Sequence, residues 1–558
     1  MKTGRNAPCA CGSGKKFKHC CAGKTAASIP TEVEFDQLAH LFNSGRYAEL
    51  ESRAASLLQR HPTSGLAWKL LCASLQMQGK DALHALQNAA KFLPNDTEAH
   101  NNLGSALQDL GQLEGAVTSY RRAIKINPDA ADVHNSLGTA LLDLMQLEEA
   151  VASYRRALKI KPNFAEAHNN LGIALQNGGD LDGAVVSYHR ALEITPDYAE
   201  AHNNLGTALR DLGQFEDALA NYHRALEIKN DYAEAHSNYA YLLLALGDFE
   251  RGWKEYEWRH TSAVCQGNPV DPRTKLPLPK ASSLLPFSAQ DKRILLFHEQ
   301  GIGDELFFLR FVPHLRQEAQ SVHYLPTDKM RSLIERSGCV DQVISQTDID
   351  LPFDSVFRVG DLPLLLGCNS TKTIPRSLRL SPTEQSVTKV RHHLSELGVV
   401  NQRLLGVTWR AGSAPLPGMP RGLFKQVELD LLADSIQGWR GAILVLQREP
   451  VPGEIDQFRA KVSCPVYDLS DYNNDLEAML ALLDVLDEYV GVSNTNMHLM
   501  AGLGKTARVL IPFPAEWRWM ASGSESPWFP GFSLYRQTVA GDWEAALAGL
   551  TRDLSDSY

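Results

Sequence analysis

The sequence has no long hydrophobic run. A membrane-spanning helix needs about 18 or more consecutive apolar residues, and no stretch of this chain approaches that length. The amino terminus also lacks the apolar core of a secretory signal. We therefore expect no membrane insertion and a cytoplasmic location.

Positive charge is in deficit. The chain has 55 Lys and Arg residues against 65 Asp and Glu residues, a formal net charge of −10. Proteins that bind the phosphates of nucleic acids or of membrane surfaces usually carry a basic surface. The balance argues against a general nucleic-acid or membrane-surface binder, although residues 1–24 are locally basic. With 44 % hydrophobic residues in 558, the chain can build the cores of several domains.

Cysteine is scarce and unevenly placed. Five of the nine cysteines stand alone, which does not make a disulfide framework. The other four are Cys9, Cys11, Cys20 and Cys21. Four thiolates satisfy one tetrahedral zinc ion, and the Gly-Ser-Gly turn after Cys11 lets the two pairs meet; His19 is an alternative ligand. Four protein ligands leave no open position, so this pattern predicts a structural zinc and not a catalytic one.

The spacing of these cysteines resembles the SEC-C motif, the zinc module at the carboxyl end of the SecA translocation motor. That resemblance implies a separate module over residues 1–24 that contacts partner proteins. It also implies that the metal binds the four cysteines and not His19.

What the sequence has in abundance is a block that recurs every 34 residues. Ala-His-Asn-Asn-Leu-Gly ends at Gly104, and related blocks end at Gly138, Gly172 and Gly206. A tyrosine follows in each copy and a closing proline in the first three, at Pro128, Pro162 and Pro196. This is the pattern of a two-helix repeat in which small residues allow close helix packing. The pattern resembles the tetratricopeptide family. With degenerate copies at both ends we expect about seven helix pairs over residues 32–262, forming an all-α solenoid whose groove binds proteins.

One groove position is polar in every copy. It is occupied by Asn102, Ser136, Asn170, Asn204 and Asn238. A carboxamide offers both a donor and an acceptor, so a row of them can bind a peptide backbone. Alternatively, the asparagines bridge adjacent repeats. The row is similar to the asparagine-lined superhelix of the O-linked N-acetylglucosamine transferases, which implies that the four asparagines bind a protein acceptor. We interpret the recurring histidines of the repeats as packing residues and not as metal ligands.

After the repeats the pattern changes. A proline-rich linker over residues 263–290 is followed by short apolar runs that alternate with amphipathic segments. The expected strands are 294–297, 321–325, 354–359, 404–409, 442–446, 488–492 and 508–511. This alternation predicts parallel sheets of the α/β type in two lobes, residues 291–385 and 400–558, that face a cleft. Ligands of such sheets bind at the carboxyl ends of the strands.

Polar and glycine residues follow these expected strands. Gly301 and Gly303 form a turn that places Asp304 at a helix amino terminus. Basic charge from Arg410 and Lys425, and a second helix start over Ser493, Asn494 and Thr495, suit a diphosphate group. Simpler roles exist for each residue: Asp304 and His498 can cap helices, and the two cations can be solvated.

Four segments carry a specific resemblance. They are His298 to Asp304, Trp409 to Gly412, Ser493 to Leu499, and Glu516 to Trp528. Together they look like bacterial tetratricopeptide glycosyltransferases, whose catalytic region is similar to that of the heptosyltransferases. The resemblance implies a GT-B-like region in which Asp304 is the catalytic base. It also implies that the segment from Ser493 to His498 and Lys425 bind the donor. Where the family has Asp-Thr, this chain has Ser493-Asn494.

These patterns lead to one hypothesis and one alternative. We expect an inverting protein glycosyltransferase that transfers a sugar from a nucleotide sugar to a protein acceptor, such as flagellin or another secreted or surface protein. Because no Asp-x-Asp motif follows an expected strand, we expect no metal dependence. The catalytic residues would be Asp304 and His498. The alternative is a non-catalytic adaptor or chaperone for a secreted protein, with a zinc module and a decayed transferase region.

Overall fold

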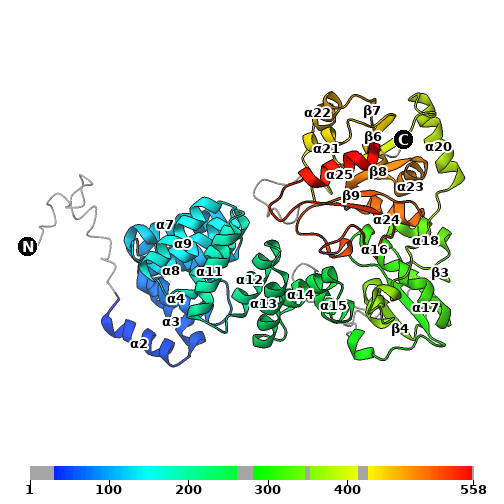
Figure 1. Cartoon of the computed structure of the whole chain (residues 1–558). Coiled ribbons are helices and arrows are strands. Elements are labelled where there is room, and N and C mark those ends of the chain that lie inside the picture. The colour runs from blue at the N-terminus through cyan, green and yellow to red at the C-terminus, as the bar shows by residue number, and fades with distance from the viewer. Residues whose placement is uncertain (1–29, 261–280, 346–351, 412–424, 556–558) are drawn as a thin grey trace, which may run out of the picture. The chain divides into compact units, whose positions relative to one another are not determined.

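The structure, a computed structural model, describes residues 30–260, 281–345, 352–411 and 425–555. The predicted zinc ligands Cys9, Cys11, Cys20 and Cys21 lie outside the described residues, as does most of the expected linker. The chain divides into two compact units, one that ends at Gly178 and one that begins at Gly179 (Figure 1). Each unit is described by itself.

The first unit consists of helices throughout its described part. They are α2 (Glu32–Asn43), α3 (Tyr47–Arg60), α4 (Gly65–Gln76), α5 (Leu83–Phe92), α6 (Thr97–Asp109), α7 (Leu113–Ile126), α8 (Ala131–Asp143), α9 (Leu147–Ile160) and α10 (Ala165–Asn177). The second unit begins with α11 (Leu181–Ile194), α12 (Ala199–Asp211), α13 (Phe215–Ile228), α14 (Ala233–Leu246) and α15 (Phe249–Tyr256). These fourteen helices of residues 30–260 confirm the predicted tetratricopeptide solenoid of about seven pairs.

Close packing explains the glycines of the repeat. A Cβ atom added to Gly104 would lie 2.6 Å from the ring of Tyr120, and one added to Gly138 would lie 2.6 Å from the ring of Tyr154. Non-bonded carbon atoms do not approach each other so closely, so glycine is required where the paired helices touch. Both tyrosines are buried, as predicted for residues that fill the contact between helices.

The repeat histidines serve the packing of the helices. The Nε2 atoms of His134 and His168 lie 3.0 and 2.9 Å from the carbonyl oxygens of Pro128 and Pro162, which end the preceding helices. Each imidazole thus donates to the backbone at the end of the preceding repeat. This contact supports the interpretation that they are packing residues.

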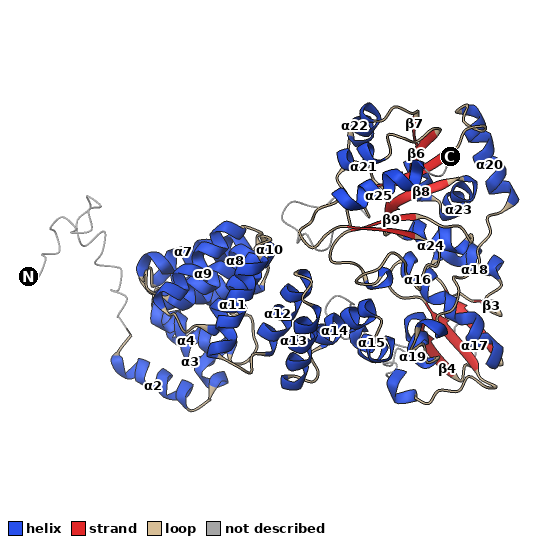
Figure 2. Ribbon diagram, viewed as in Figure 1, coloured by secondary structure: helices blue, strands red, loops and turns tan. Residues whose placement is uncertain are grey.

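Two parallel sheets follow the repeats in the second unit (Figure 2). The first has the order β3-β2-β1-β4 and the second the order β10-β9-β8-β5-β6-β7. Their strands are β1 (Arg293–Phe297), β2 (Ser321–Leu325), β3 (Gln342–Val343), β4 (Ser355–Arg358), β5 (Leu404–Thr408), β6 (Ala442–Val445), β7 (Val466–Asp468), β8 (Glu488–Val492), β9 (Arg508–Ile511) and β10 (Ser533–Arg536). All seven expected strands are present within one or two residues of their predicted ends, and β3, β7 and β10 were not expected.

Helices connect and cover these strands. They are α16 (Ile302–Phe308), α17 (Val312–Glu318), α18 (Arg331–Ser337), α19 (Leu362–Leu365), α20 (Glu384–Glu396), α21 (Leu429–Ser435), α22 (Glu454–Lys461), α23 (Leu476–Val485), α24 (Thr495–Gly502) and α25 (Glu544–Ser555). The strands β5 and β6 are buried along their whole length, as expected for parallel strands covered on both faces.

The last repeat packs against the α/β region through aromatic rings. Trp253 of α15 makes edge contacts with Phe308, Trp517 and Trp528, at centroid distances of 6.3, 5.4 and 5.9 Å. Because this core joins the last repeat helices to the sheets, the boundary between the two units falls inside the repeat array, at Gly178, and not at its end. No helix in the described part of the chain is long and apolar enough to cross a membrane.

Candidate functional site

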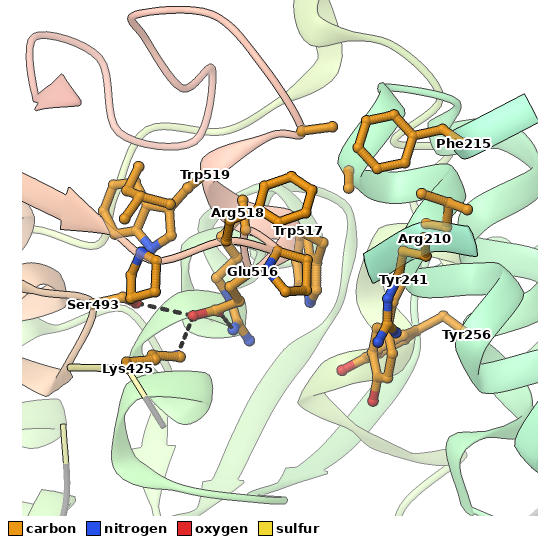
Figure 3. Close-up of a pocket in the computed structure, with 18 of the residues that line it drawn as sticks. Arg210, Phe215, Tyr241, Tyr256, Lys425, Ser493, Glu516, Trp517, Arg518 and Trp519 are labelled. Atoms are coloured by element: carbon orange, nitrogen blue, oxygen red, sulfur yellow. Dashed lines mark hydrogen bonds and ion pairs between the residues drawn. The ribbon is translucent and has the colours of Figure 1, made fainter. Parts of the chain in front are cut away.

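A cavity of about 430 Å³ lies in the second unit. One wall comes from the repeat helices and includes Arg210, Phe215, Tyr241 and Tyr256 (Figure 3). The opposite wall comes from segments that follow β1, β5, β8 and β9, and it includes Asp304, Lys425, Ser493, Glu516 and Arg518. Three of the predicted site residues therefore line one cavity, together with two charged residues that had no assigned role.

Glu516 is the centre of the charged wall. Its carboxylate accepts from Nζ of Lys425, from Oγ of Ser493 at 2.9 Å and from Nη1 of Arg518 (Figure 3). Burial opposes ionisation of this carboxyl, but the charges of Lys425 and Arg518 outweigh it and hold the pKa of Glu516 well below its usual range. Two cations and a hydroxyl thus converge on one negative group, which is the arrangement of an anion-binding site.

Asp304 lies in the first turn of α16. Its carboxylate accepts the backbone N–H of Gly301 at 3.3 Å and forms an ion pair with Nη2 of Arg518. The predicted capping role is therefore present, and the side chain also faces the cavity. Arg518 is 7 % exposed and joins the carboxylates of Asp304 and Glu516, which come from segments more than 200 residues apart in the chain.

The junction between β5 and β8 holds a hydrogen-bond network. Asn494 caps α24, and its Nδ2 donates to Oγ1 of Thr408 at 3.0 Å and to the hydroxyl of Tyr489 at 3.1 Å. Oδ1 of Asn494 accepts the backbone N–H of Asn496 at 3.0 Å. The side chain of Asn494 is thus bound within the protein, whereas its neighbour Ser493 lines the cavity. Thr495 begins α24.

His498 lies one turn into α24 and is half-buried between Phe307 and Phe529. Burial, with a smaller contribution from Arg518, lowers the pKa of His498 well below its usual value, so the ring is neutral at physiological pH. Gly303 approaches this ring closely, since a Cβ atom there would lie 3.3 Å from Cδ2 of His498. His498 therefore packs behind the cavity and is not among its lining residues.

Arg410 is bound within the protein. It is 5 % exposed, and its Nη2 donates to Glu454 at 3.1 Å and to the carbonyl oxygen of Glu449 at 3.1 Å. Nη1 also lies 3.4 Å from the carbonyl oxygen of Arg448. A phosphate could reach this guanidinium only by replacing these acceptors, so donor binding by Arg410 stays a prediction.

The groove asparagines form contacts between successive repeats. Nδ2 of Asn170 donates to Oδ1 of Asn135 at 3.2 Å, and Nδ2 of Asn238 donates to Oδ1 of Asn203 at 3.0 Å. These two asparagines therefore have the bridging role that was the alternative to peptide binding, and each bond uses only part of a carboxamide. Asn102 lines a smaller cavity of about 250 Å³ in the first unit.

The groove position of α14 continues into the large cavity. Asn238, Tyr241, Leu242 and Ala245 are spaced i, i+3, i+4 and i+7, so they share one face of the helix. The last three of these line the cavity. The face that carries the asparagine therefore leads directly to Asp304 and Glu516 on the opposite wall.

Side chains able to bind a metal ion do not gather in the described ranges, which exclude residues 1–29. These ranges contain no group of three or more His, Cys, Asp or Glu side chains that could hold a metal ion. The four cysteines of the predicted zinc module lie in the excluded segment.

Comparison with protein families finds matches in the amino-terminal half. The tetratricopeptide repeat models match residues 107–144, 140–179 and 163–231, and a SEC-C motif matches residues 5–23. No curated protein matches the sequence significantly.

Solved structures similar to the chain cover the repeats. YrrB, "a TPR protein with an unusual peptide-binding site", is 22 % identical with a TM-score of 0.29, and the match covers 33 % of this chain and 95 % of that one. MamA is 23 % identical over 29 % of this chain and 97 % of its own, with a TM-score of 0.28. TTC0263, a thermophilic TPR protein of Thermus thermophilus, is 25 % identical over 32 % of this chain and 100 % of its own, with a TM-score of 0.29. The family models thus identify tetratricopeptide repeats and a SEC-C motif ahead of the α/β region.

Proposed function

We propose that the chain is a protein glycosyltransferase, in which the repeats bind a protein acceptor and the α/β region, as a GT-B-like domain, binds a nucleotide sugar. One observation carries the proposal: a single cavity has a repeat face as one wall and the charged residues at the strand ends as the other. Tetratricopeptide grooves bind peptides or proteins, and the strand ends of parallel sheets are where ligands bind.

The donor diphosphate would replace Glu516 in its contacts. Lys425, Ser493 and Arg518 already converge on one carboxylate, and a diphosphate presents the same type of acceptor with more charge. Neutralising the charge that grows on the leaving diphosphate is the main electrostatic requirement of the reaction. These residues supply it without a metal ion.

Asp304 is the proposed base. It would take the proton of the acceptor hydroxyl while the oxygen attacks the anomeric carbon from the face opposite the diphosphate. A new C–O bond forms, the bond to the diphosphate breaks, and the nucleoside diphosphate leaves with that electron pair, so the configuration inverts. Because Arg518 contacts both Asp304 and Glu516, it would hold the base in place beside the leaving group. Neutral His498 would support the loop that carries Asp304 through its contact with Gly303.

The acceptor would enter along α12 and α14. Asn204 and Asn238 lie on these helices, and Arg210 and Tyr241 on the same helices line the cavity. A peptide bound at the asparagines would therefore place its next residues beside Asp304. Flagellin, or another secreted or surface protein, is the acceptor that the resemblance to tetratricopeptide glycosyltransferases implies.

Calorimetric titration of the full chain with a panel of nucleotide sugars tests the donor site. We expect one nucleotide sugar to bind. Lys425→Ala should weaken its affinity at least about tenfold, because one charge-assisted hydrogen bond is lost. Lys389→Ala on α20 should leave the affinity unchanged. Lys389 is an exposed lysine outside the cavity. Binding that is equal in both variants would refute the proposed donor site.

The alternative function is a non-catalytic adaptor or chaperone. It is favoured by the family matches, which fall on the repeats and the SEC-C motif, both of them interaction modules. If no nucleotide sugar binds while a client protein does, the adaptor function holds and the transferase does not.

We also propose that Cys9, Cys11, Cys20 and Cys21 bind one structural zinc ion. Removal of residues 1–24 should abolish zinc, as measured by elemental analysis, and leave donor titrations unchanged. Zinc that persists after this truncation would place the metal elsewhere.

A further inference from the structure

A second large cavity, of about 590 Å³, lies in the second unit between α17, the end of α18 and residues 375–379. Of the described residues that line it, none is acidic, and four are arginines: Arg310, Arg316, Arg376 and Arg379. The chain as a whole carries a net charge of −10. The described lining of this cavity is therefore basic although the chain as a whole is acidic. The cavity shares no lining residue with the proposed transferase cavity.

Arg310 forms part of the cavity wall and is 2 % exposed. Its guanidinium donates to the carbonyl oxygens of Phe307 at 3.0 Å and Trp528 at 2.8 Å, and to Oγ of Ser377 at 3.3 Å. Among the described residues no carboxylate pairs with it. Burial lowers the pKa of Arg310 to about 9. A buried charge without a counter-charge is costly, so an anion beside it would be stabilising.

Arg376 and Arg379 lie at the mouth of the same cavity. Both are exposed, they stand three residues apart on the segment that leads to α20, and neither has an ion pair with a described residue. Between them, Ser377 accepts from Arg310, which leaves its own hydroxyl hydrogen for another acceptor. Arg316 contributes less, because its Nη2 lies 2.8 Å from Oδ1 of Asp341.

We propose that this cavity binds a small phosphorylated anion through Arg376, Arg379 and the hydroxyl of Ser377, with Arg310 supplying buried positive charge beneath. The planar fork of arginine matches two oxygens of a phosphate group, which favours phosphate over a compact halide or a neutral ligand. The volume is in the range of small-molecule sites, about 300 to 1,000 Å³.

Inorganic pyrophosphate is the probe, titrated calorimetrically into the full chain carrying Lys425→Ala, so that the transferase cavity has already lost a cation. In this background we compare Arg376→Gln/Arg379→Gln with Lys389→Gln/Arg391→Gln. The control pair removes the same charge from exposed positions on α20. All four side chains are exposed, so both double variants should fold, and circular dichroism verifies it.

We expect pyrophosphate to bind the background protein and its α20 control equally, and binding to the Arg376/Arg379 variant to be at least about tenfold weaker. Binding should also weaken as sodium chloride rises from low to physiological concentration. Equal binding by both double variants, or no binding by the background protein, overturns this site. Neither result bears on the transferase, whose donor titration depends on Lys425 and not on Arg376.

Discussion

Arg259 donates to both carboxylate oxygens of Glu299, from Nη2 to Oε1 at 2.8 Å and from Nε to Oε2 at 3.1 Å. Arg259 follows the last repeat helix and Glu299 follows β1, and both side chains are almost inaccessible. Nη2 also lies 2.7 Å from Oδ1 of Asp361, which follows β4. The segment after the last repeat helix thus fills the crevice between the ends of β1 and β4, where the strand order reverses. Open α/β sheets commonly bind ligands at such a crevice. The corresponding crevice of the second sheet, between β5 and β8, is where the proposed donor would bind.

Arg259→Met should destabilise the second unit by about 3–5 kcal/mol, because it removes the bidentate partner of the buried Glu299 carboxylate and leaves Arg358, at 3.8 Å, as its cation. Arg259→Met/Glu299→Gln should recover part of this loss. Arg224→Met, which breaks an exposed pair with Asp197, should cost less than about 1 kcal/mol. Urea denaturation measures all three. Equal effects of Arg259→Met and Arg224→Met would show that the buried ion pairs of Arg259 stabilise the second unit no more than an exposed pair does.

Asp304→Asn should lower the transfer rate by about 10²–10⁴-fold, the usual contribution of a general base, while donor affinity is retained. The substitution keeps the size of the side chain at the helix start. Asp328→Asn, an exposed residue that precedes α18, serves as the control. Transfer at the normal rate by Asp304→Asn would remove this residue from the mechanism.

Glu516→Gln should tighten the binding of a nucleoside diphosphate that carries no sugar. In the unliganded protein Glu516 competes with phosphate for Lys425 and Arg518, and its removal frees two cations for the ligand. We expect a gain of up to about tenfold, equivalent to about 1.4 kcal/mol, by calorimetry. Weaker binding would instead mean that Glu516 contacts the ligand directly.

The same carboxylate predicts a pH dependence of stability. Lys425 and Arg518 outweigh the effect of burial and depress the pKa of Glu516 in the folded state. Its contribution is therefore fully present above the unfolded pKa of about 4.3 and is lost as pH falls towards the folded value. The difference in melting temperature between wild type and Glu516→Gln should be constant from pH 6 to 8 and should shift against the wild type below about pH 4.5. A difference that does not change at acid pH would exclude the depressed pKa.

Ser136→Asn should stabilise the first unit. Asn170 and Asn238 each donate to the asparagine 35 positions earlier, and the residue 35 before Ser136 is Asn101, whose buried Oδ1 has no hydrogen-bond partner among the described residues. The restored bridge should add about 0.5–1.5 kcal/mol. Ser153→Asn is the control, because both serines lose the same kind of bond when replaced. Oγ of Ser153 donates to the carbonyl oxygen of Glu149 at 2.8 Å, and Oγ of Ser136 donates to that of Asp132 at 3.1 Å. If both substitutions have the same effect, the asparagine row does not hold the repeats together.

The repeat helices were predictable because their information is local and periodic. The 34-residue spacing of the sequence block reappears in the starts of α6, α8, α10, α12 and α14. The central strands were predictable from their apolar runs. Three strands lack that signal: β3 has two residues, and β7 and β10 lie at the edges of the second sheet with polar residues among theirs.

The site was predictable only in part. Asp304, Lys425 and Ser493 follow strands, and the rule that strand ends converge brings them to one cavity. The partnership of Glu516 with Lys425 spans 91 residues and that of Arg518 with Asp304 spans 214, and no periodicity reports contacts at such separations. Arg410 has the sequence context of a phosphate ligand, yet Glu454 from the following strand–helix unit binds it.

The position of the boundary at Gly178 has a consequence for how such a gene can change. Near-identical blocks of 34 residues invite unequal recombination, which inserts or deletes whole copies. Copies that precede Gly178 form a compact unit of their own, separate from the unit that holds the sheets, so their number can vary more freely. The last copy is fixed by Trp253 and Arg259 in the core of the α/β region. Duplication would therefore alter the repeats that offer a binding groove far more readily than the α/β region.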